Sequence, residues 1–126
     1  MNFPADLRYT AHDEWCRLEG DVLVLGISDF AQDALGELVH IEFPDVGKVF
    51  AAGDEAAEVE SVKAVAPVYS PVAGTVVAVN SALDGNEGDI NSKPYASWLF
   101  KIKVADVSSV AAATLDAAAY QAKIAR

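Results

Sequence analysis

Short apolar runs separated by turn residues occupy the first part of the chain, a pattern typical of β-strands. Strands are predicted at residues 7–9 and at Glu14–Glu19, with a turn at residues 20–21 before the next run. Val22–Ile27 is apolar at almost every position, which indicates a strand buried on both faces. Another strand is predicted over residues 38–43. Further turns are predicted at residues 44–47 and 51–54.

A short helix is predicted at residues 28–36. Ser28 can accept hydrogen bonds from the first amides of this helix. Asp29 favours the positive end of the helix dipole, and Gly36 can end the helix in a left-handed conformation.

The last third of the chain contains one more strand and a helical tail. Residues 98–104 alternate apolar with charged side chains after Phe100, which predicts a half-buried strand with its lysines outward. Residues 107–125 are rich in alanine and favour helix. Asp116 is the predicted N-cap of a C-terminal helix at Ala117–Ile124.

A weak internal repeat relates residues 36–54 to residues 74–89. Each copy begins with glycine, continues as a strand and an irregular connection, and ends in Gly-Asp. Two copies related by a pseudo-two-fold axis would form a flattened sandwich of two sheets. Biotinyl and lipoyl carrier domains are built in this way, so the predicted fold is mostly β and of that class.

Lys63 lies between the two copies, where two strand-like runs meet. The β-branched Val62 and Val65 stiffen the flanking strands, and the small Ala64 leaves room around the amine. An exposed lysine at a turn is usually structurally neutral. This context instead favours an unhindered amine at a hairpin tip, where a modifying enzyme could attach a prosthetic group.

The charge and composition of the chain exclude several classes of function. A formal net charge of −10 argues against binding to nucleic acid or to an anionic membrane surface. The length of 126 residues suits one domain, predicted to span residues 1–126. The one cysteine, Cys16, cannot form an internal disulfide bond, which suits a reducing compartment. Because neither a secretory signal nor a membrane-spanning run is recognised, we expect a cytoplasmic protein.

The scattered reactive side chains do not predict an active site. His12, Asp13 and Cys16 lie close together on an extended segment, where neighbouring side chains point to opposite faces. Cys16 is therefore expected in the core, and His40 on a strand face. Two histidines and one cysteine without ligand spacing do not predict a metal site.

Several motifs along nearly the whole chain resemble those of the glycine cleavage system H protein. The central one is Glu-Ser-Val-Lys-Ala at residues 60–64, followed by Ser-Pro-Val-Ala-Gly at residues 70–74. The runs at residues 26–32 and 35–39 are similar to a characteristic family segment. Further similarities lie at residues 9–10, 14–15, 19–22, 91, 94–95 and 98–99.

This resemblance implies a lipoyl-type barrel-sandwich hybrid fold and a carrier that is not an enzyme. Lipoate would be joined to Lys63 by lipoate-attaching enzymes. The lipoyl arm would take the aminomethyl group from the P protein, which decarboxylates glycine, and present it to the T protein for one-carbon metabolism. The L protein would then reoxidise the arm.

Glu14 matches the family position that lines the cleft for the loaded arm, whose cationic group would favour a carboxylate. The alternative is a strand-face glutamate beside a buried Trp15. The chain departs from the family pattern at Asp13, where histidine is usual, at Pro67, where aspartate is frequent, and in a shortened stretch around Ala96. We expect these departures to lie around the same cleft.

Other carrier roles remain open at this level. A lipoyl domain of a 2-oxoacid dehydrogenase would usually continue into a Pro/Ala linker and a catalytic domain, and a biotin site would usually place methionines beside the lysine. An H-like protein could also serve as a lipoyl relay or regulatory protein outside glycine cleavage.

Overall fold

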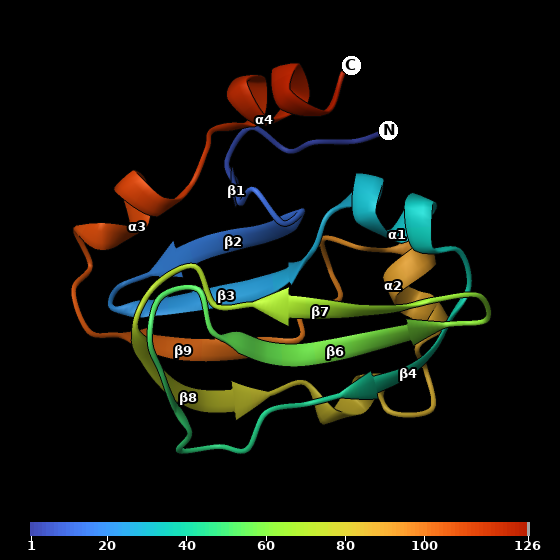
Figure 1. Ribbon diagram of the computed structural model, residues 1–126, viewed down its shortest axis with the longest axis horizontal. Coiled ribbons are helices and arrows are strands. Elements are labelled where there is room, and N and C mark those ends of the chain that lie inside the picture. The colour runs from blue at the N-terminus through green and yellow to red at the C-terminus, as the bar shows by residue number, and fades with distance from the viewer. Residues whose placement is uncertain (126) are drawn as a thin grey trace.

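Two antiparallel sheets pack against each other in the computed structural model, which describes residues 1–125 (Figure 1). Residue 126, the last of the predicted domain, lies outside the described residues. The larger sheet has the strand order β1 (Arg8–Tyr9), β2 (Glu14–Glu19), β3 (Val22–Ile27), β9 (Phe100–Val104), β8 (Gly74–Val79) and β5 (Val49–Phe50). The smaller sheet has the order β4 (Leu38–Glu42), β6 (Glu55–Ser61) and β7 (Val65–Tyr69).

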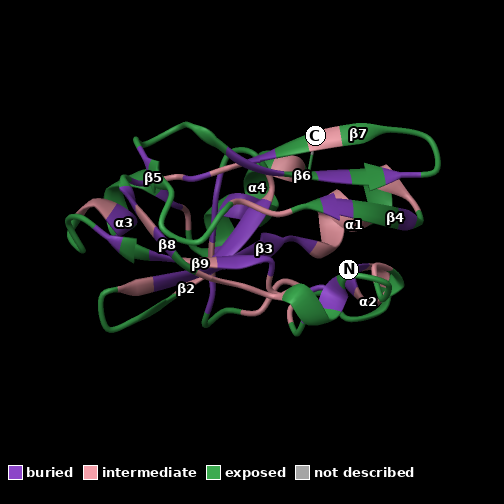
Figure 2. Ribbon diagram, turned by 90° about the horizontal axis from the view of Figure 1, so that it is seen from below, coloured by how far each residue is buried: buried purple, intermediate pink, exposed green. Residues whose placement is uncertain are grey.

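The main core is formed by buried residues of both sheets, and Figure 2 colours the buried residues along the strands. Strand β6 shows the alternation that produces this core, because Val59 and Ser61 are buried while Glu58 and Glu60 are exposed. The small sheet therefore turns an acidic face to solvent. The mostly β sandwich predicted from the sequence is confirmed.

A second apolar cluster covers the outer face of the large sheet. Tyr9, Trp15 and Val24 from the sheet pack with Tyr120 of the C-terminal helix α4 (Ala117–Ile124). The rings of Tyr9 and Tyr120 stack with centroids 4.7 Å apart. Strand β3 is thus buried on both faces, as its continuous apolar run predicted, because Leu23 belongs to the main core and Val24 to this cluster.

Helix α1 (Asp29–Leu35) begins and ends at the residues predicted. The Ser28 side chain accepts a hydrogen bond from the Ala31 backbone N–H at 3.1 Å. Gly36 closes the helix through its own N–H to the Gln32 carbonyl, with φ 82° and ψ −158°. The predicted closure of the helix by Gly36 at a left-handed, positive φ is confirmed, and its ψ places the residue in a region that is open essentially to glycine alone.

The C-terminal helix α4 has the predicted bounds, and the Asp116 side chain accepts from the Ala119 N–H at 2.8 Å. The alanine-rich tail is interrupted before it. Helix α3 (Ser109–Ala113) ends at Thr114, which is extended, and Leu115 exchanges two backbone hydrogen bonds with Tyr9. The bridge to β1 therefore overrides the local helix preference of the tail.

Further differences from the sequence expectations concern element boundaries, two missed helices and the internal repeat. Strand β4 ends at Glu42 rather than residue 43, and β9 begins at Phe100 rather than residue 98. The acidic loop after β8 contains a 3₁₀ turn (Ser81–Leu83) and helix α2 (Gly88–Ser92). In the internal repeat, each copy therefore begins with a strand, β4 in one and β8 in the other. The Gly-Asp ends of the two copies differ in structure, since residues 53–54 form a turn and residues 88–89 begin a helix.

No helix in the described part of the chain combines the length and apolar character needed to cross a bilayer.

Candidate functional site

Lys63 stands at the exposed tip of the hairpin that joins β6 and β7, where the sequence placed it. The buried Ser61 shapes this tip, because its hydroxyl accepts hydrogen bonds from the backbone N–H groups of Lys63 at 3.2 Å and Ala64 at 3.0 Å. The Ser61 N–H also donates to the Ala64 carbonyl at 2.8 Å. The backbone around the lysine is therefore fixed while the side chain faces outward.

The hairpin tip rests against the end of helix α1. The Val62 N–H donates to the Glu37 carbonyl at 3.0 Å. The Lys63 side chain passes beside Gly36, where an added Cβ would lie 3.4 Å from the lysine Cε. Figure 1 shows α1, α2 and the β6–β7 turn gathered at one end of the molecule.

Asn91 of helix α2 holds this end together. Its Oδ1 accepts from the Leu38 N–H at 3.0 Å, while its Nδ2 donates to the Gly36 carbonyl at 2.8 Å and to Gln32 Oε1 at 3.0 Å. One side-chain amide thus supplies hydrogen-bond partners for backbone groups at the end of α1 and at the start of β4. These are the two segments beneath Lys63.

A cleft of about 160 Å³ opens beside the same helix. One wall comes from α1, through Ala31, Ala34 and Leu35, and the opposite wall comes from the small sheet. His12 and Asp13 of the turn between β1 and β2 close its end together with Glu14, the first residue of β2. The full lining is His12, Asp13, Glu14, Ile27, Ala31, Ala34, Leu35, Val59, Ala66, Pro67 and Val68.

Glu14 is the buried carboxylate of this cleft, with only 1% of its surface exposed. Oε1 accepts from the Thr10 hydroxyl and Oε2 accepts from the Tyr69 backbone N–H at 3.1 Å. Burial raises the pKa of Glu14, and the hydrogen bonds from Thr10 and Tyr69 oppose that rise. A cation entering the cleft would favour the ionised form of Glu14. The carboxylate oxygens that would accept from it are already held in position by Thr10 and Tyr69.

Comparison with known proteins identifies the class of this chain. A family model described as glycine cleavage H-protein matches residues 7–126. The chain belongs to this family. It is 53% identical over 124 residues to the glycine cleavage system H protein 2 of Pseudomonas syringae pv. tomato, which covers 98% of this chain and 97% of that protein.

Other relatives agree. The glycine cleavage system H protein of Thiobacillus denitrificans is 52% identical over 122 residues, covering 96% of this chain and 94% of that protein. The crystal structure of the Mycobacterium marinum H protein superposes with a TM-score of 0.88 at 34% identity, covering 98% of this chain and 100% of that one. As an H-protein family member, the chain is a non-catalytic carrier component of the glycine cleavage system, with the barrel-sandwich fold of that family.

Two of the three departures from the H-protein pattern meet in the cleft. Asp13 lines it from the turn before β2, and Pro67 lines it from β7. Pro67 is tolerated because β7 is an edge strand. Proline has no backbone N–H, and on the outer side of an edge strand there is no neighbouring strand to receive one. The expectation for Ala96 is wrong, because Ala96 lies with Asn2 and Asp29 around a different hollow.

Several residues that shape the site were not singled out from the sequence. Thr10, four residues before Glu14, could have been suggested by the tight turn that brings its hydroxyl back. Tyr69 binds Glu14 through its backbone N–H, which leaves no trace in side-chain chemistry, and its ring packs against the lining residue His12 with centroids 4.4 Å apart. Ser61 and Asn91 belong to motifs that were noted, but their bonds span turns and distant segments.

The remaining reactive side chains lie outside the carrier site. Cys16 is fully buried, and burial raises the pKa of its thiol to about 12, so it stays an inert core residue as predicted. His40 is exposed on the face of β4, also as predicted. In the part of the chain that the structure describes, no three His, Cys, Asp or Glu side chains gather as metal ligands.

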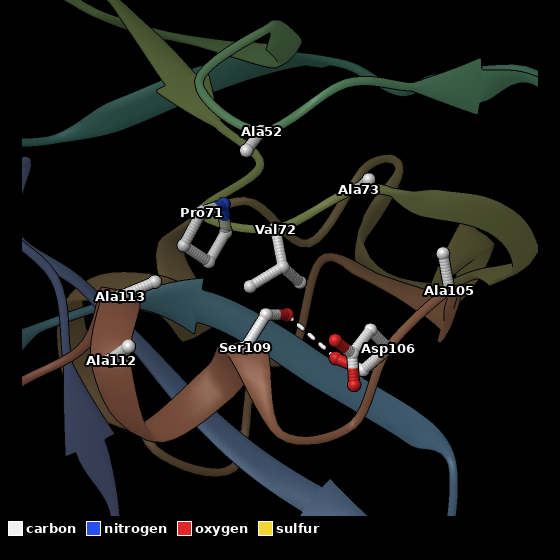
Figure 3. Close-up of a pocket in the computed structure, with 9 residues that line it drawn as sticks. All are labelled: Ala52, Pro71, Val72, Ala73, Ala105, Asp106, Ser109, Ala112 and Ala113. Atoms are coloured by element: carbon white, nitrogen blue, oxygen red, sulfur yellow. Dashed lines mark hydrogen bonds between the residues drawn. The ribbon is translucent and has the colours of Figure 1, made fainter.

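A larger apolar hollow of about 340 Å³ lies at the other end of the molecule, beside helix α3 (Figure 3). Small side chains make up most of its lining, and Ser109 Oγ donates to the Asp106 carbonyl at its edge at 2.6 Å. Its residues are Ala52, Pro71, Val72, Ala73, Ala105, Asp106, Ser109, Ala112 and Ala113. Since α3 and the β6–β7 turn lie at opposite ends in Figure 1, this hollow is separate from the lysine.

Proposed function

We propose that residues 1–126 act in the cytoplasm as a lipoyl carrier of glycine cleavage, with lipoate joined to Lys63 and the loaded arm sheltered in the cleft that ends at Glu14. The observation that carries this proposal is the arrangement of one rigidly held, exposed lysine next to a cleft with a buried carboxylate. The family match supplies the class of cofactor.

The residues present fit a lipoyl arm. The lysine side chain already lies over Gly36, and the next residue back along α1, Leu35, lines the cleft. An arm folded back along this helix would meet the apolar surfaces of Ala31, Ala34 and Val59 before reaching Glu14. Lipoate, when bound, would supply a disulfide whose sulfur takes up the aminomethyl group, and the arm would be left as a dithiol once that group is passed on.

The chain's own residues supply reach and shelter. Ser61 and Asn91 fix the backbone beneath Lys63, so the attachment point does not move with the arm. The apolar walls exclude water, and Glu14 offers a carboxylate to the positive charge of the load. Protection from hydrolysis is therefore the property expected of this cleft.

The proposed partners are the P, T and L proteins and the lipoate-attaching enzymes. Near Lys63 the outer face of the small sheet is acidic, with Glu42 paired directly opposite Glu58 and with Glu60 exposed on the neighbouring row. Like charges directly opposite one another disfavour the sheet, so this face suits partners that bring basic side chains.

The test is glycine-dependent carrier activity with purified partners, using the lipoylated chain and the Lys63→Arg variant. Arginine keeps the positive charge but cannot form the lipoyl amide, so activity should fall to background while the fold is retained. Lys48→Arg, at an exposed turn, is the matched control and should keep full activity. Carrier activity surviving in Lys63→Arg would overturn the assignment.

A further inference from the structure

The hydroxyl group of Tyr120, on helix α4, reaches two segments that border the cleft. It lies 2.8 Å from Ser28 Oγ, the N-cap of α1. It also donates to Asp13 Oδ1, in the turn between β1 and β2, at 2.9 Å. These contacts join positions 92 and 107 residues apart in the chain.

The donor and acceptor roles in this group follow from counting protons. A tyrosine hydroxyl has one proton, and Tyr120 donates it to the Asp13 carboxylate. Ser28 must therefore donate to the Tyr120 oxygen, while Ser28 Oγ accepts from the Ala31 N–H at 3.1 Å. The bonds run in one direction from Ala31 through Ser28 and Tyr120 to Asp13, and each polarises the next.

The two ends of this series are both lining residues of the cleft. Ala31 belongs to the α1 wall, and Asp13 precedes the buried Glu14. Asp13 is the residue in the described chain that holds a positive φ without being glycine, at 69°. Such a backbone is unfavourable for most residues and persists where surrounding bonds hold it, here those from Tyr120 to the side chain and from the Ser28 N–H to the Asp13 carbonyl.

We propose that Tyr120 is a positioning residue of the cleft, which sets the separation between helix α1 and the Asp13–Glu14 turn and thereby controls how long a loaded arm stays protected. The inference rests on the proposed function and adds the C-terminal helix to the carrier machinery. Tyr120 itself does not line the cleft and acts through Ser28 and Asp13. Burial raises the pKa of Tyr120, so its hydroxyl remains a proton donor throughout the neutral range.

The contributions of the Tyr120 ring and of its hydroxyl can be measured separately by mutation. The ring stacks on Tyr9 and packs edge-on against Phe3 at 5.7 Å between centroids. Tyr120→Phe keeps these contacts and removes only the hydroxyl. Tyr9→Phe is the control, because the Tyr9 ring belongs to the same apolar cluster while its hydroxyl donates to the Pro4 carbonyl rather than to Ser28 or Asp13.

The experiment uses the full chain in two forms. In the unlipoylated chain, amide hydrogen exchange is measured at Ala31 and Gln32; in the loaded chain, the rate of formaldehyde and ammonia release is measured. Tyr120→Phe should speed both by roughly threefold to tenfold, the range for losing one hydrogen bond. Tyr9→Phe should leave both near wild type. In a Ser28→Ala background, Tyr120→Phe should have a smaller effect, because the two residues share one bond series.

Unchanged exchange and unchanged release in Tyr120→Phe would overturn the proposal. Faster exchange with unchanged release would also overturn it, since Tyr120 would then support the fold alone. Failure of the proposed function is distinguishable, because a chain that carries no lipoate on Lys63 still allows the exchange measurement to test the bonds from Tyr120.

Discussion

The backbone N–H of Tyr69 donates a 3.1 Å hydrogen bond to the carboxylate of Glu14, 55 residues earlier in the chain. This bond connects β7 of the small sheet to β2 of the large sheet. The other carboxylate oxygen accepts from Thr10, so both oxygens are engaged. Glu14 is therefore both a link between the sheets and the polar end of the cleft.

The first prediction concerns stability and pH. Burial raises the pKa of Glu14 above its value in the unfolded chain, so folding favours the neutral form. The associated stability is fully present below the unfolded pKa of about 4.3 and is lost as pH rises through the folded pKa. Glu14→Gln removes the titration, so the unlipoylated variant should melt higher than wild type at pH 7, with an advantage that shrinks toward pH 4.

Thermal melts of the unlipoylated forms across this pH range provide the measurement. Glu55→Gln is the matched control, because Glu55 is exposed at the start of β6 and is paired in register with Tyr69 rather than with another acidic residue, so it should show little pH-dependent difference. A Glu14→Gln variant that is less stable than wild type at pH 7, or whose advantage grows in acid, would contradict this account.

The second prediction concerns the cargo. Glu14→Gln keeps the shape of the side chain and removes the charge that would pair with the cationic load. Lipoylation of Lys63 should proceed normally, while the loaded arm should release formaldehyde and ammonia several-fold faster. Release rates measured after loading check this, and equal rates in the two proteins would leave Glu14 as a structural link between sheets only.

The third prediction concerns Gly36. Its φ of 82° and ψ of −158° lie in a region that side chains disfavour, and an added Cβ would meet the Lys63 side chain at 3.4 Å. Gly36→Ala should lower the free energy of unfolding by about 1–3 kcal/mol. Chemical denaturation measures the change. Gly88→Ala is the control, since Gly88 has no positive φ and open space around its Cα, and it should not be destabilised.

Elements whose signals are local were predicted well from the sequence. Strands β2 and β3 and helix α4 have the predicted bounds, because a short run ended by a turn, a continuous apolar run and the Asp116 cap each lie within the element or directly beside it. Helix α2 was missed because a five-residue helix has little intrinsic stability and depends on distant partners. The Ser97 hydroxyl, for example, donates to the Asp89 carbonyl.

The residues of the site divide in the same way, into those with a local sequence signal and those that depend on distant segments. Lys63 and Glu14 carry recognisable chemistry in recognisable motifs, so both could be named beforehand. Thr10, Tyr69 and Tyr120 act through bonds to segments that only the fold brings together. The misplacement of Ala96 has the same origin, since a departure from a family motif does not say which hollow the residue borders.

The fourth prediction compares three forms of the chain. Lys63 is exposed, so attachment of lipoate buries little apolar surface, and the unlipoylated and oxidised forms should melt at nearly the same temperature. Loading should raise the melting temperature, because a docked arm binds the native state alone. A loaded form that melts no higher than the oxidised form would show that the cleft with Asp13 and Pro67 does not hold the arm.

The most direct test of the central claim is the mass of the chain after expression with a lipoylating system, followed by peptide mapping. The account predicts one lipoyl increment, located on the peptide that contains Lys63, and no increment in Lys63→Arg. A lipoyl increment on any other lysine, or one that persists in Lys63→Arg, would contradict it.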